Sequence, residues 1–389
     1  MTPPNSFNPA PAALEGLRVL ELATLYAAPA IGAALGDFGA DVVKVEPPHG
    51  DPLRRLSPDT WLLTARNKRS FSIDFKSEAG LAELAALADI ADCILVNQPL
   101  RILKRWGVSY EQVRKRNPRV VYVSVSTYGA SGPLAGVVGN GSIGEAFGGF
   151  TNLNGLAETG PLLTSLPVGD FLASLSGIIG TLAACYWRDA RGGDGQFVDI
   201  SMYEPILALL GSSLAGWVPG TPPPMRNGGL IDGTTPRRTY HTADGEWVVV
   251  SGPTDQQVAR LLPLIGADSP GDLERFGSSA ARARHAGDLD QLVESWIQQH
   301  PVTHVLTAMR DARIPCSQVQ DLEAIVNNKH IRERQSLYAL GDGGEQRFLP
   351  SPIPSMSKTP GRVAHAATPA GHDTEVIRKQ WLANLTDPV

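Results

Sequence analysis

Arg18-Val-Leu-Glu-Leu22 and Asp41-Val-Val-Lys-Val-Glu46 are the two segments that decide the fold, because a helix-forming segment joins them. Each is short and largely apolar, which predicts buried strands. The small residues of 30–38 predict a helix between them, and Gly39 suits its C-terminal stop. A strand, a helix and a second strand in this order predict two parallel strands joined by a crossover helix.

The same alternation continues to about residue 205. Leu81, Leu84 and Leu87, for example, have helical spacing. The predicted helices are 77–88, 109–116 and 170–190, and the predicted strands are 93–96, 120–125 and 196–202. The sequence therefore predicts an α/β fold whose large domain has a Rossmann-like parallel sheet.

The composition changes between residues 215 and 240. Pro222-Pro-Pro224, Asn227-Gly-Gly229 and Asp232-Gly233 predict a linker or a mobile loop. A strand at 245–251 and helical segments to about residue 330 then predict a smaller α+β domain. The predicted division is a loose arm (1–13), the large domain (14–214), the linker with the small domain (215–330), and an extended return to the large domain (331–389).

Charge and cysteine content limit the expected partners. The formal net charge is -5 and no block of like charges stands out, so nucleic acid is not an expected partner. Cys93, Cys185 and Cys316 are far apart and lack CxxC or CxxH spacing, so neither a disulfide framework nor a zinc site is predicted, and no metal is expected. Free thiols of this kind fit a reducing cytoplasm.

No segment predicts a membrane location. Residues 1–13 have neither a basic start nor an apolar centre, so they are not expected to form a signal peptide. The longest apolar run, Phe171 to Trp187, carries Ser174, Ser176 and Thr181 and is short for a membrane span. We expect it to be a buried helix of a cytoplasmic protein.

The common nucleotide and hydrolase motifs are absent from the sequence. Ala23-Thr-Leu-Tyr-Ala-Ala-Pro29, after the first predicted strand, lacks the glycines of a dinucleotide site, so NAD is not expected. Gly36-Asp-Phe-Gly39 contains the DFG triplet of kinases, but no other kinase element accompanies it. Without a GxSxG, HExxH or P-loop motif, serine hydrolases, zincins and P-loop NTPases are disfavoured.

Asp170 is the candidate catalytic residue, in Leu166-Pro-Val-Gly-Asp-Phe-Leu-Ala-Ser174 at the start of a predicted apolar helix. One interpretation is an ordinary N-cap that accepts the first free N–H groups of the helix. In the other, the helix N-terminus keeps the carboxylate ionised and Gly169 leaves open space beside it. Such a carboxylate can attack a thioester and form a covalent acyl intermediate. Spacing alone leaves both interpretations open.

A series of short motifs runs in order along nearly the whole chain, from about Leu14 to about Leu382. The motifs are Leu14-Glu-Gly-Leu-Arg-Val-Leu-Glu-Leu22 with Ala28-Pro29, Leu35-Gly-Asp-Phe-Gly-Ala-Asp-Val-Val-Lys-Val-Glu-Pro47 with Gly50-Asp51, Asn67-Lys-Arg-Ser70, Ala91-Asp92 leading to Asn97, Asn117-Pro-Arg119, Tyr128-Gly129 with Ser131-Gly-Pro133, Gly169-Asp170, and the turn from Gly193 to Gln196 with Val198-Asp199. By their order and spacing the chain resembles the family III CoA transferases, or CaiB/BaiF family, which includes formyl-CoA transferase and carnitine CoA-transferase.

The resemblance implies an enzyme that moves CoA from an acyl-CoA donor to a small carboxylic acid. The nucleophilic aspartate of the family matches Asp170. This residue would form first a mixed anhydride and then an aspartyl-CoA thioester. The neighbouring Gly169 would belong to the substrate site. The family's CoA-binding arginine matches Arg105, for which a solvated helix charge is the alternative. The other positions implied to bind coenzyme A are Thr24, Leu25, Tyr26, Ala27, Asn67, Lys68, Arg69 and Asn97. Relatives form interlocked homodimers, so a homodimer is expected.

Two segments depart from the family pattern. Asn97-Gln-Pro-Leu-Arg101 replaces the usual Asn-Phe-(Arg or Lys)-Pro-Gly, so a basic contact to CoA is lost or moved to Arg101. Asn140-Gly141 replaces an acidic residue after an aromatic one, which puts the CoA contacts of Val138 and Asn140 in doubt. Racemases of this family have histidine at the position of Asn140, and asparagine cannot act as the base. Asn140 therefore disfavours an acyl-CoA racemase or isomerase, which is kept as an alternative, as is a CoA-binding protein without catalysis.

Basic residues around the glycine-rich loop 227–233 suggest a substrate class. By resemblance this loop, with Gly228 and Gly229, corresponds to a mobile loop over the site and would offer N–H groups to oxyanions; a plain surface loop is the alternative. Arg226, Arg237 and Arg238 flank the loop, and such a cluster suits the second carboxylate of a dicarboxylic acid.

Overall fold

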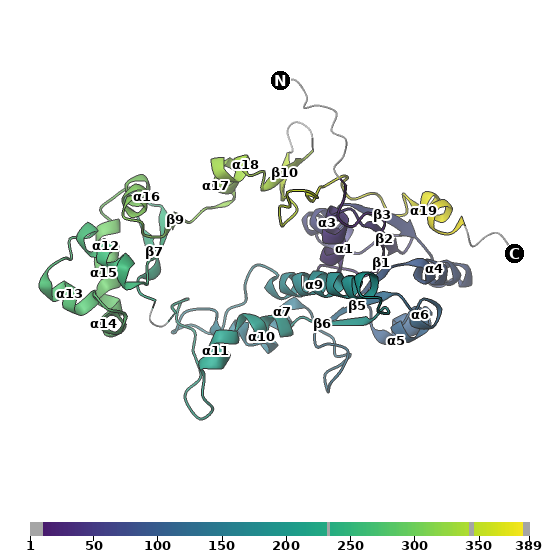
Figure 1. The fold of residues 1–389 in the computed structure, drawn as a ribbon, viewed down its shortest axis with the longest axis horizontal. Helices are drawn as coiled ribbons and strands as arrows, with labels where there is room; N and C mark the ends of the chain where they lie inside the picture. Colours follow the sequence, from purple (N-terminus) through teal and green to yellow (C-terminus); the bar gives the residue numbers. More distant parts are fainter. Residues whose placement is uncertain (1–10, 232–233, 342–345, 384–389) are drawn as a thin grey trace, which may run out of the picture. The chain divides into compact units, whose positions relative to one another are not determined.

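The computed structural model describes residues 11–231, 234–341 and 346–383. Most of its elements are labelled in Figure 1. The chain forms two compact units, one of Met1–Asn152, Leu163–Pro224 and Gln335–Val389, the other of Leu153–Leu162 and Met225–Arg334. Most of the predicted arm at 1–13, and Asp232 and Gly233 of the predicted loop, lie outside the described residues.

A six-stranded sheet, ordered β3-β2-β1-β4-β5-β6, forms the centre of the first unit. All of its strands run parallel. The strands are β1 (Arg18–Leu22), β2 (Asp41–Glu46), β3 (Lys68–Ser72), β4 (Cys93–Val96), β5 (Val121–Ser126) and β6 (Phe197–Ser201). The predicted α/β fold with a parallel sheet is confirmed, and β1, β2 and β4 have the predicted bounds. The sequence interpretation did not include β3.

The strand order reverses between β1 and β4. From β1 the chain proceeds to β2 and β3 at one edge, and β4, β5 and β6 then extend the sheet at the other edge. The last residues of β1 and β4, Leu22 and Val96, are register partners. Ligands of open α/β sheets bind at the carboxyl ends of the strands at such a reversal. The segments after Leu22 and Val96 are therefore the first place to look for a site.

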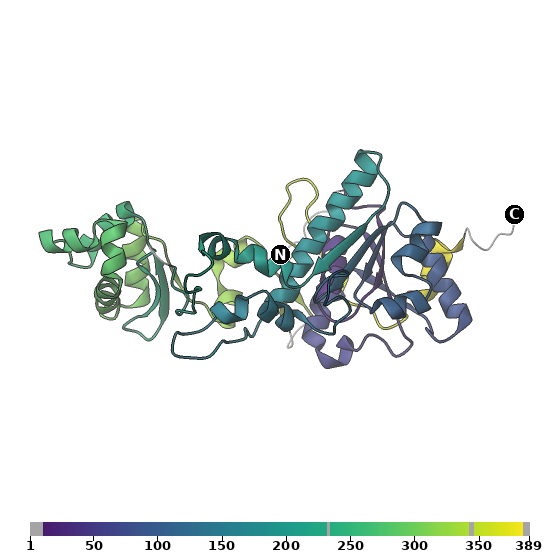
Figure 2. The ribbon, with the colours of Figure 1, turned by 90° about the horizontal axis from the view of Figure 1, so that it is seen from below.

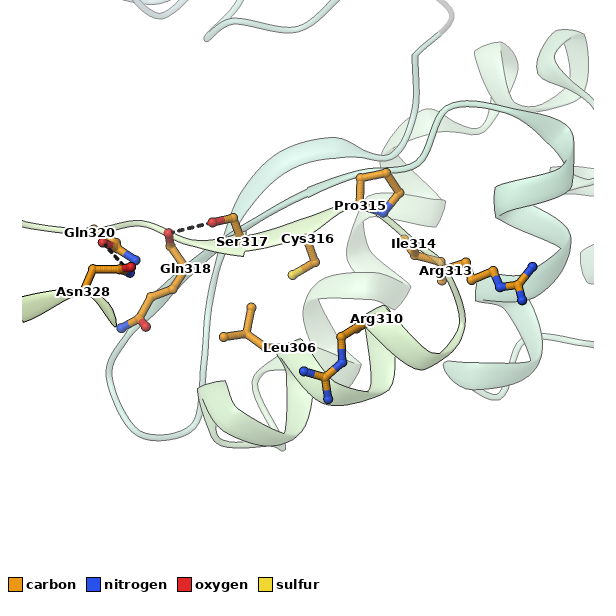
Figure 3. A pocket seen from close by; sticks show the side chains of 10 residues that line it. All are labelled: Leu306, Arg310, Arg313, Ile314, Pro315, Cys316, Ser317, Gln318, Gln320 and Asn328. Carbon is orange, nitrogen blue, oxygen red and sulfur yellow. Dashed lines mark hydrogen bonds between the residues drawn. The ribbon is translucent and has the colours of Figure 1, made fainter. Parts of the chain in front are cut away.

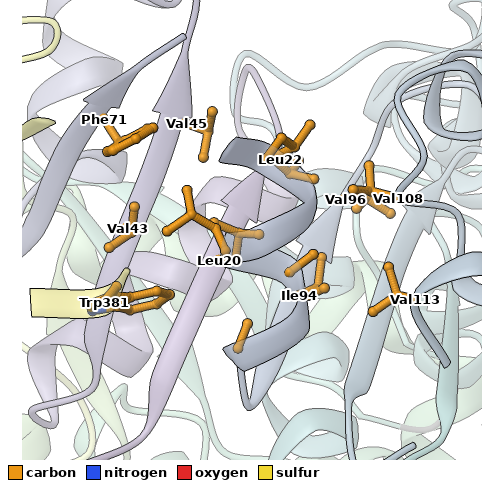
Figure 4. Packing of buried hydrophobic residues seen from close by; sticks show 14 of the residues in the cluster. Leu20, Leu22, Val43, Val45, Phe71, Ile94, Val96, Val108, Val113 and Trp381 are labelled. Carbon is orange, nitrogen blue, oxygen red and sulfur yellow. The ribbon is translucent and has the colours of Figure 1, made fainter. Parts of the chain in front are cut away.

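Helices cover both faces of this sheet. One core contains Leu20, Val43, Ile94 and Trp381, which Figure 4 shows together. Its helices are α4 (Glu78–Ile90), α5 (Leu100–Arg105), α6 (Tyr110–Arg116) and α19 (Thr374–Trp381). The opposite core contains Val19 and is covered by α1 (Ala27–Asp37) and α9 (Val168–Ala190). Figure 2 shows α9 running alongside the strands. Successive strand residues face opposite cores because their side chains alternate.

Helix α9 contacts α1 through small side chains. Its buried positions, which include Ala173, Gly177, Thr181 and Ala184, recur every three or four residues and so share one face. A Cβ atom at Gly177 would lie 2.2 Å from Cδ1 of the buried Ile31. The absence of a side chain at Gly177 therefore sets how closely the two helices approach.

The other face of α9 is exposed in the single chain. Phe171, Leu175, Ile179, Leu182 and Tyr186 are exposed there. Among the described residues α9 is the one helix long and apolar enough to cross a membrane, a test of length and composition that core helices of soluble proteins also pass. The expectation of a buried helix holds for one face of α9 only.

Shorter elements complete the first unit. They are α2 (Leu53–Leu56), α3 (Pro58–Thr64), α7 (Gly141–Phe147), α8 (Phe150–Leu153), α10 (Glu204–Leu209), α11 (Gly211–Gly216) and the antiparallel pair β10 (Leu337–Leu340) and β11 (Arg347–Pro350). Leu153, the last residue of α8, already belongs to the second compact unit.

The second unit packs helices against a small antiparallel sheet. The sheet has the order β7-β8-β9, with β7 (Arg237–His241), β8 (Trp247–Ser251) and β9 (Cys316–Gln318). The helices are α12 (Asp255–Leu264), α13 (Pro270–Phe276), α14 (Ser279–Arg284), α15 (Ala286–Ile297), α16 (Val302–Asp311), α17 (Leu322–Asn327) and α18 (Lys329–Glu333). Val248, Val250, Leu261, Val293 and Met309 belong to its core.

Residues near the C-terminus return to the first sheet and bind β2 and β3. The Asn67 amide donates to the carbonyl of Arg362 (2.7 Å). The indole Nε1 of Trp381 donates to Asp41 Oδ2 (2.8 Å). Trp381 and Ile377 also join the core that contains Leu20. Helix α19 thus covers part of one face of the sheet formed by β1 to β6.

Gly177→Ala is expected to lower the free energy of unfolding by about 1–3 kcal/mol, because the added methyl group overpacks against Ile31. Thermal unfolding followed by circular dichroism measures the effect. Gly211→Ala is the control in the same unit, since nothing lies within 4 Å of a Cβ there. Equal melting temperatures for the two variants would show that the contact is not tight.

Candidate active site

A buried ion cluster lies under the start of α1. Lys44 Nζ is 3.0 Å from Glu21 Oε1 and 2.8 Å from Asp51 Oδ2. Lys68 Nζ is 2.5 Å from Glu21 Oε2. The two ammonium groups also donate to the carbonyls of Ala23 (2.7 Å) and Pro29 (2.6 Å). Burial, the largest cause, lowers the pKa of Lys68 to about 8 against the opposing effect of Glu21. The cluster thereby holds the backbone on both sides of the turn that leads into α1.

Asn97 fixes the turn after β1 from the end of β4. Its Oδ1 accepts the Thr24 N–H (3.0 Å), and its Nδ2 donates to the Thr24 carbonyl (2.7 Å). The next residue, Leu25, is exposed and has a φ of 64°, which is unusual for a non-glycine residue. The side chain of Asn97 therefore connects the ends of β1 and β4 at the point where the strand order reverses.

The N-terminus of α1 has no side-chain cap. Tyr26 is its N-cap residue, its side chain makes no capping hydrogen bond, and the first turn has no acidic residue. The first N–H groups of a helix have no partner within the helix and carry a partial positive charge. This helix end can therefore receive a negative group of a substrate.

Asp170 lies in the first turn of α9, close to this end of α1. Ser174 Oγ, one turn further on, donates to the Ala27 carbonyl (2.9 Å) and is 2.7 Å from the Asp170 carbonyl oxygen. The half-buried Tyr26 phenol has a raised pKa, first because of burial and then because of the charge of Asp170. Tyr26, Ala27 and Asp170, which the sequence interpretation assigned to one site, are thus neighbours.

The N-cap interpretation of Asp170 is wrong. Helix α9 begins at Val168, its N-cap residue is Pro167, and no side chain of the cap residue bonds to the helix. Glu145 of α7 accepts the N–H of Gly169 instead, with Oε1 2.9 Å from the nitrogen. The Asp170 carboxylate is therefore not required for capping.

The pKa of Asp170 is raised, although the helix end was expected to favour its ionised form. Burial and, second, the negative charge of Glu145 raise this pKa to about 6, against the opposing effect of a hydrogen bond from the Asp170 N–H. A carboxyl group with this pKa remains mostly ionised at neutral pH. Asp170 is therefore an unusually basic carboxylate rather than an unusually acidic one.

The space beside Gly169 is filled, contrary to expectation. A Cβ at Gly169 would lie 2.6 Å from the Gly141 carbonyl oxygen and 3.2 Å from Glu145 Cγ. A Cβ at Gly141 would lie 1.9 Å from Asp170 Oδ2. Glycine at both positions thus lets the start of α7 pack directly against the start of α9 and the candidate nucleophile.

The segment Asn67 to Arg69 binds within the protein. The Lys68 ammonium is in the ion cluster described above. The Asn67 amide bonds to Asp37 Oδ1 (2.8 Å) besides the Arg362 carbonyl, and Arg69 Nε donates to Asp41 Oδ1 (2.8 Å). These side chains order β3 and its surroundings, and a contact of this segment with CoA stays a prediction.

Arg101 and Arg105 are both on α5, immediately after Asn97. Both are exposed, and neither guanidinium has an ion pair with any described residue. They are therefore available to a negatively charged ligand at the end of β4. Val138 is 93% exposed, and Asn140 is the N-cap residue of α7, with its side chain accepting the Ile143 N–H (3.2 Å).

The flanking arginines of the glycine-rich loop belong to the second unit. Arg226 Nε donates to the Thr159 carbonyl (2.6 Å), and an Arg237 Nη donates to the Gly229 carbonyl. Arg238 Nη1 is 3.5 Å from Asp290 Oδ2. Gly228 and Gly229 both have positive φ, 74° and 84°, which only glycine adopts readily. Each arginine therefore has an internal partner but keeps further N–H donors.

An open pocket in the second unit lies among Leu306, Arg310, Cys316, Gln318 and Asn328 (Figure 3). Burial raises the pKa of the Cys316 thiol in this pocket to about 11, so the thiolate is scarce at neutral pH. No chemistry is apparent there. Within the described residues, no group of three or more His, Cys, Asp or Glu side chains could hold a metal ion.

Glu145 is the residue near Asp170 that the sequence interpretation missed. It is 1% exposed, although glutamate is seldom buried unless it has partners. Its partners are residues 19 and 24 positions further along the chain. No local motif signals such contacts, so an alignment or a structure is needed to find them.

Comparison with known proteins gives the family. Residues 14–374 match CoA-transferase family III. The succinyl-CoA–D-citramalate CoA-transferase of Chloroflexus aurantiacus is 33% identical, with 94% of each chain covered. The beta subunit of the succinyl-CoA–L-malate CoA-transferase from the same organism is 30% identical, over 97% of this chain and 96% of that one. The crystal structure of a CaiB/BaiF family protein from Brucella suis superimposes with a TM-score of 0.83 at 25% identity, over 95% and 99% of the two chains.

The α/β fold brings the starts of α1 and α9 together at the carboxyl ends of its strands, where sheets of this kind bind ligands. The chain belongs to CoA-transferase family III, the CaiB/BaiF family, and is a transferase that uses CoA thioesters. The predicted family resemblance and enzyme class are confirmed.

Asn97→Ala is expected to loosen the turn after β1, because Thr24 loses a partner for both its N–H and its carbonyl. Two such bonds contribute roughly 1–3 kcal/mol, enough to speed amide exchange in a peptide spanning 22–27 about tenfold or more. Hydrogen exchange with mass spectrometry measures this. Asn117→Ala, which removes bonds to Ala88 and Ala91 instead, should leave that peptide unchanged.

Proposed function

We propose that the protein moves CoA from an acyl-CoA donor to a dicarboxylic acid and that Asp170 is the nucleophile. The observation that carries the proposal is the position of Asp170. Its carboxylate is not the N-cap of α9 and lies beside the start of α1, which has no side-chain cap. The Asp170 carboxylate accepts its own backbone N–H but not the N–H of Gly169, which binds Glu145.

The reaction begins when an Asp170 oxygen attacks the thioester carbonyl of the donor. The C–S bond breaks, which gives a mixed anhydride and CoA thiolate. The thiolate attacks the aspartyl carbonyl, releases the donor acid and forms an aspartyl-CoA thioester. The acceptor carboxylate attacks this thioester and releases CoA thiolate again. The thiolate then attacks the acceptor half of the new anhydride, so that acceptor-CoA leaves and the Asp170 carboxylate returns. Each step exchanges one activated acyl group for another, so no external energy source is needed.

The surroundings of Asp170 suit this chemistry. Tetrahedral oxyanions form at each attack, and N–H groups at the start of α1 are aligned donors for such charge. The exposed Arg101 and Arg105 on α5 offer cations to the phosphates of CoA. Asn97 holds the turn after β1 against the end of β4, so the two elements that would contact CoA keep a fixed spacing.

A dicarboxylic substrate is favoured by two independent facts. The similar enzymes from Chloroflexus aurantiacus are named for succinyl-CoA with citramalate or malate, all of which derive from dicarboxylic acids. This chain also has Arg226, Arg237 and Arg238 around its glycine-rich loop, and guanidinium groups bind carboxylates in bidentate geometry. We propose that these arginines take the carboxylate that does not react.

The working form is proposed to be an interlocked homodimer in the cytoplasm. The exposed face of α9, with Phe171, Leu175, Ile179 and Tyr186, is a contiguous apolar surface of the kind that a second copy covers. This accounts for an apolar helix that is only half buried in the single chain.

Asp170→Asn is expected to reduce CoA transfer roughly 10³-fold or more, because a carboxamide cannot form the anhydride. Mass spectrometry should find a hydroxylamine-sensitive CoA adduct at Asp170 in the wild type and none in the variant. Asp189→Asn, at the other end of α9, is the matched control and should retain activity. Wild-type rates in Asp170→Asn would overturn the proposal. Solvent deuterium entering the α-carbon without an acceptor acid would indicate an isomerase instead.

Arg237→Ala is expected to raise KM for a dicarboxylic acceptor roughly tenfold or more, the equivalent of about 1.4 kcal/mol, while a monocarboxylic acceptor is affected far less. Steady-state kinetics with succinate and with a monocarboxylate of similar length measure the difference. Arg275→Ala, in the same unit and paired with Asp288, controls for the loss of a positive charge. Equal losses for both acids would count against a carboxylate-binding role.

A further inference from the structure

Glu145 is a buried charge for which the proposed mechanism has no use. It faces the first turn of α9 from α7, where it accepts the Gly169 N–H at 2.9 Å. Its other oxygen is 3.3 Å from the hydroxyl Oγ1 of Thr164. No cation is within ion-pair distance of it among the described residues. A carboxylate buried with neutral partners only is costly, so a role beyond folding is worth seeking.

We propose that Glu145 is a positioning residue for CoA transfer: it occupies the free N–H at the start of α9 so that the Asp170 carboxylate stays available, and its negative charge disfavours a second negative charge on Asp170. This inference deepens the proposed function and rests on Asp170 being the nucleophile.

The geometry supports the first part of this role. The first N–H groups of α9 have no partner within the helix, and an aspartate in the first turn readily folds back onto them. The bond between Glu145 and Gly169 removes one of those donors from competition. Gly141 and Gly169 allow the approach, because a side chain at either would meet Asp170, the Gly141 carbonyl or Glu145 itself.

The charges around Asp170 support the second part. Burial is the larger cause of its raised pKa, about 6, and Glu145 is the next. The other titratable group facing it is Tyr26, at the start of α1. On the remaining elements packed against α9, Asp199 of β6 binds the Ala130 N–H and Glu204 of α10 binds Ser201. Glu145 is thus the charge whose removal should act on Asp170 most directly.

The proposed effect on reactivity follows from proton affinity. A more basic carboxylate is a better nucleophile toward the thioester, provided that it is ionised at the working pH. With its pKa at about 6, Asp170 is roughly nine-tenths ionised at pH 7. As the pH falls through 6, Asp170 gains a proton and transfer should stop. The acid limb of the rate profile therefore reports on Asp170.

The test uses Glu145→Gln, which is isosteric and can still accept the Gly169 N–H while it donates to Thr164 Oγ1. The pH dependence of kcat/KM should show its acid midpoint near pH 6 in the wild type and lower by roughly half to one pH unit in the variant. Infrared difference spectra against Asp170→Asn follow the protonation of Asp170 directly, without any need for turnover. Glu204→Gln, a carboxylate lost from another element against α9, should leave both midpoints in place.

Glu145→Ala separates the electrostatic effect of Glu145 from its binding of the Gly169 N–H. It should move the infrared midpoint as Glu145→Gln does and also reduce kcat further, since the Gly169 N–H then competes for Asp170. An unchanged infrared midpoint in Glu145→Gln would overturn the electrostatic part, and equal kcat values for the Gln and Ala variants would overturn the capping part. If Asp170→Asn remained active, the proposed function would fail, while the infrared titration would still report whether Glu145 acts on Asp170.

Discussion

The ion cluster of Glu21, Lys44 and Lys68 is the interaction on which the rest of the first unit depends. These three side chains come from neighbouring strands and are almost fully buried. Removing any one would leave uncompensated charge in the interior, which costs several kcal/mol. Because the two ammonium groups also hold the carbonyls of Ala23 and Pro29, the cluster sets where β1 ends and how α1 starts.

The position of α1 in turn determines the position of the candidate nucleophile. Helix α9 follows α1 because Gly177 permits close contact with Ile31 and Ser174 bonds to the Ala27 carbonyl. Asp170 is one turn before Ser174, so the position of its carboxylate depends on the position of α1. Charges inside the sheet thereby help to set the position of the candidate nucleophile.

Periodicity made the central strands predictable, whereas contacts distant in sequence were not. The apolar segments 18–22, 41–46 and 93–96 coincide with β1, β2 and β4. In β3, Lys68 and Ser70 are buried through polar partners on other strands, Glu21 and Glu46, so its composition does not indicate a strand. Asp170 was identified through a family motif. Its basic character was not, because it depends on burial and on Glu145, which a one-dimensional pattern does not contain.

The covering of a sheet built by residues 18–201 with helix α19 has a consequence for synthesis on the ribosome. Leu20 and Val43 are among the first core residues to be made, yet Ile377 and Trp381, which pack in the same core, are among the last. The intervening 225–334 unit has its own core and can fold while the first sheet still lacks this cover. During translation, part of that nascent sheet therefore stays uncovered until Trp381 has emerged, a period in which chaperones would have a target.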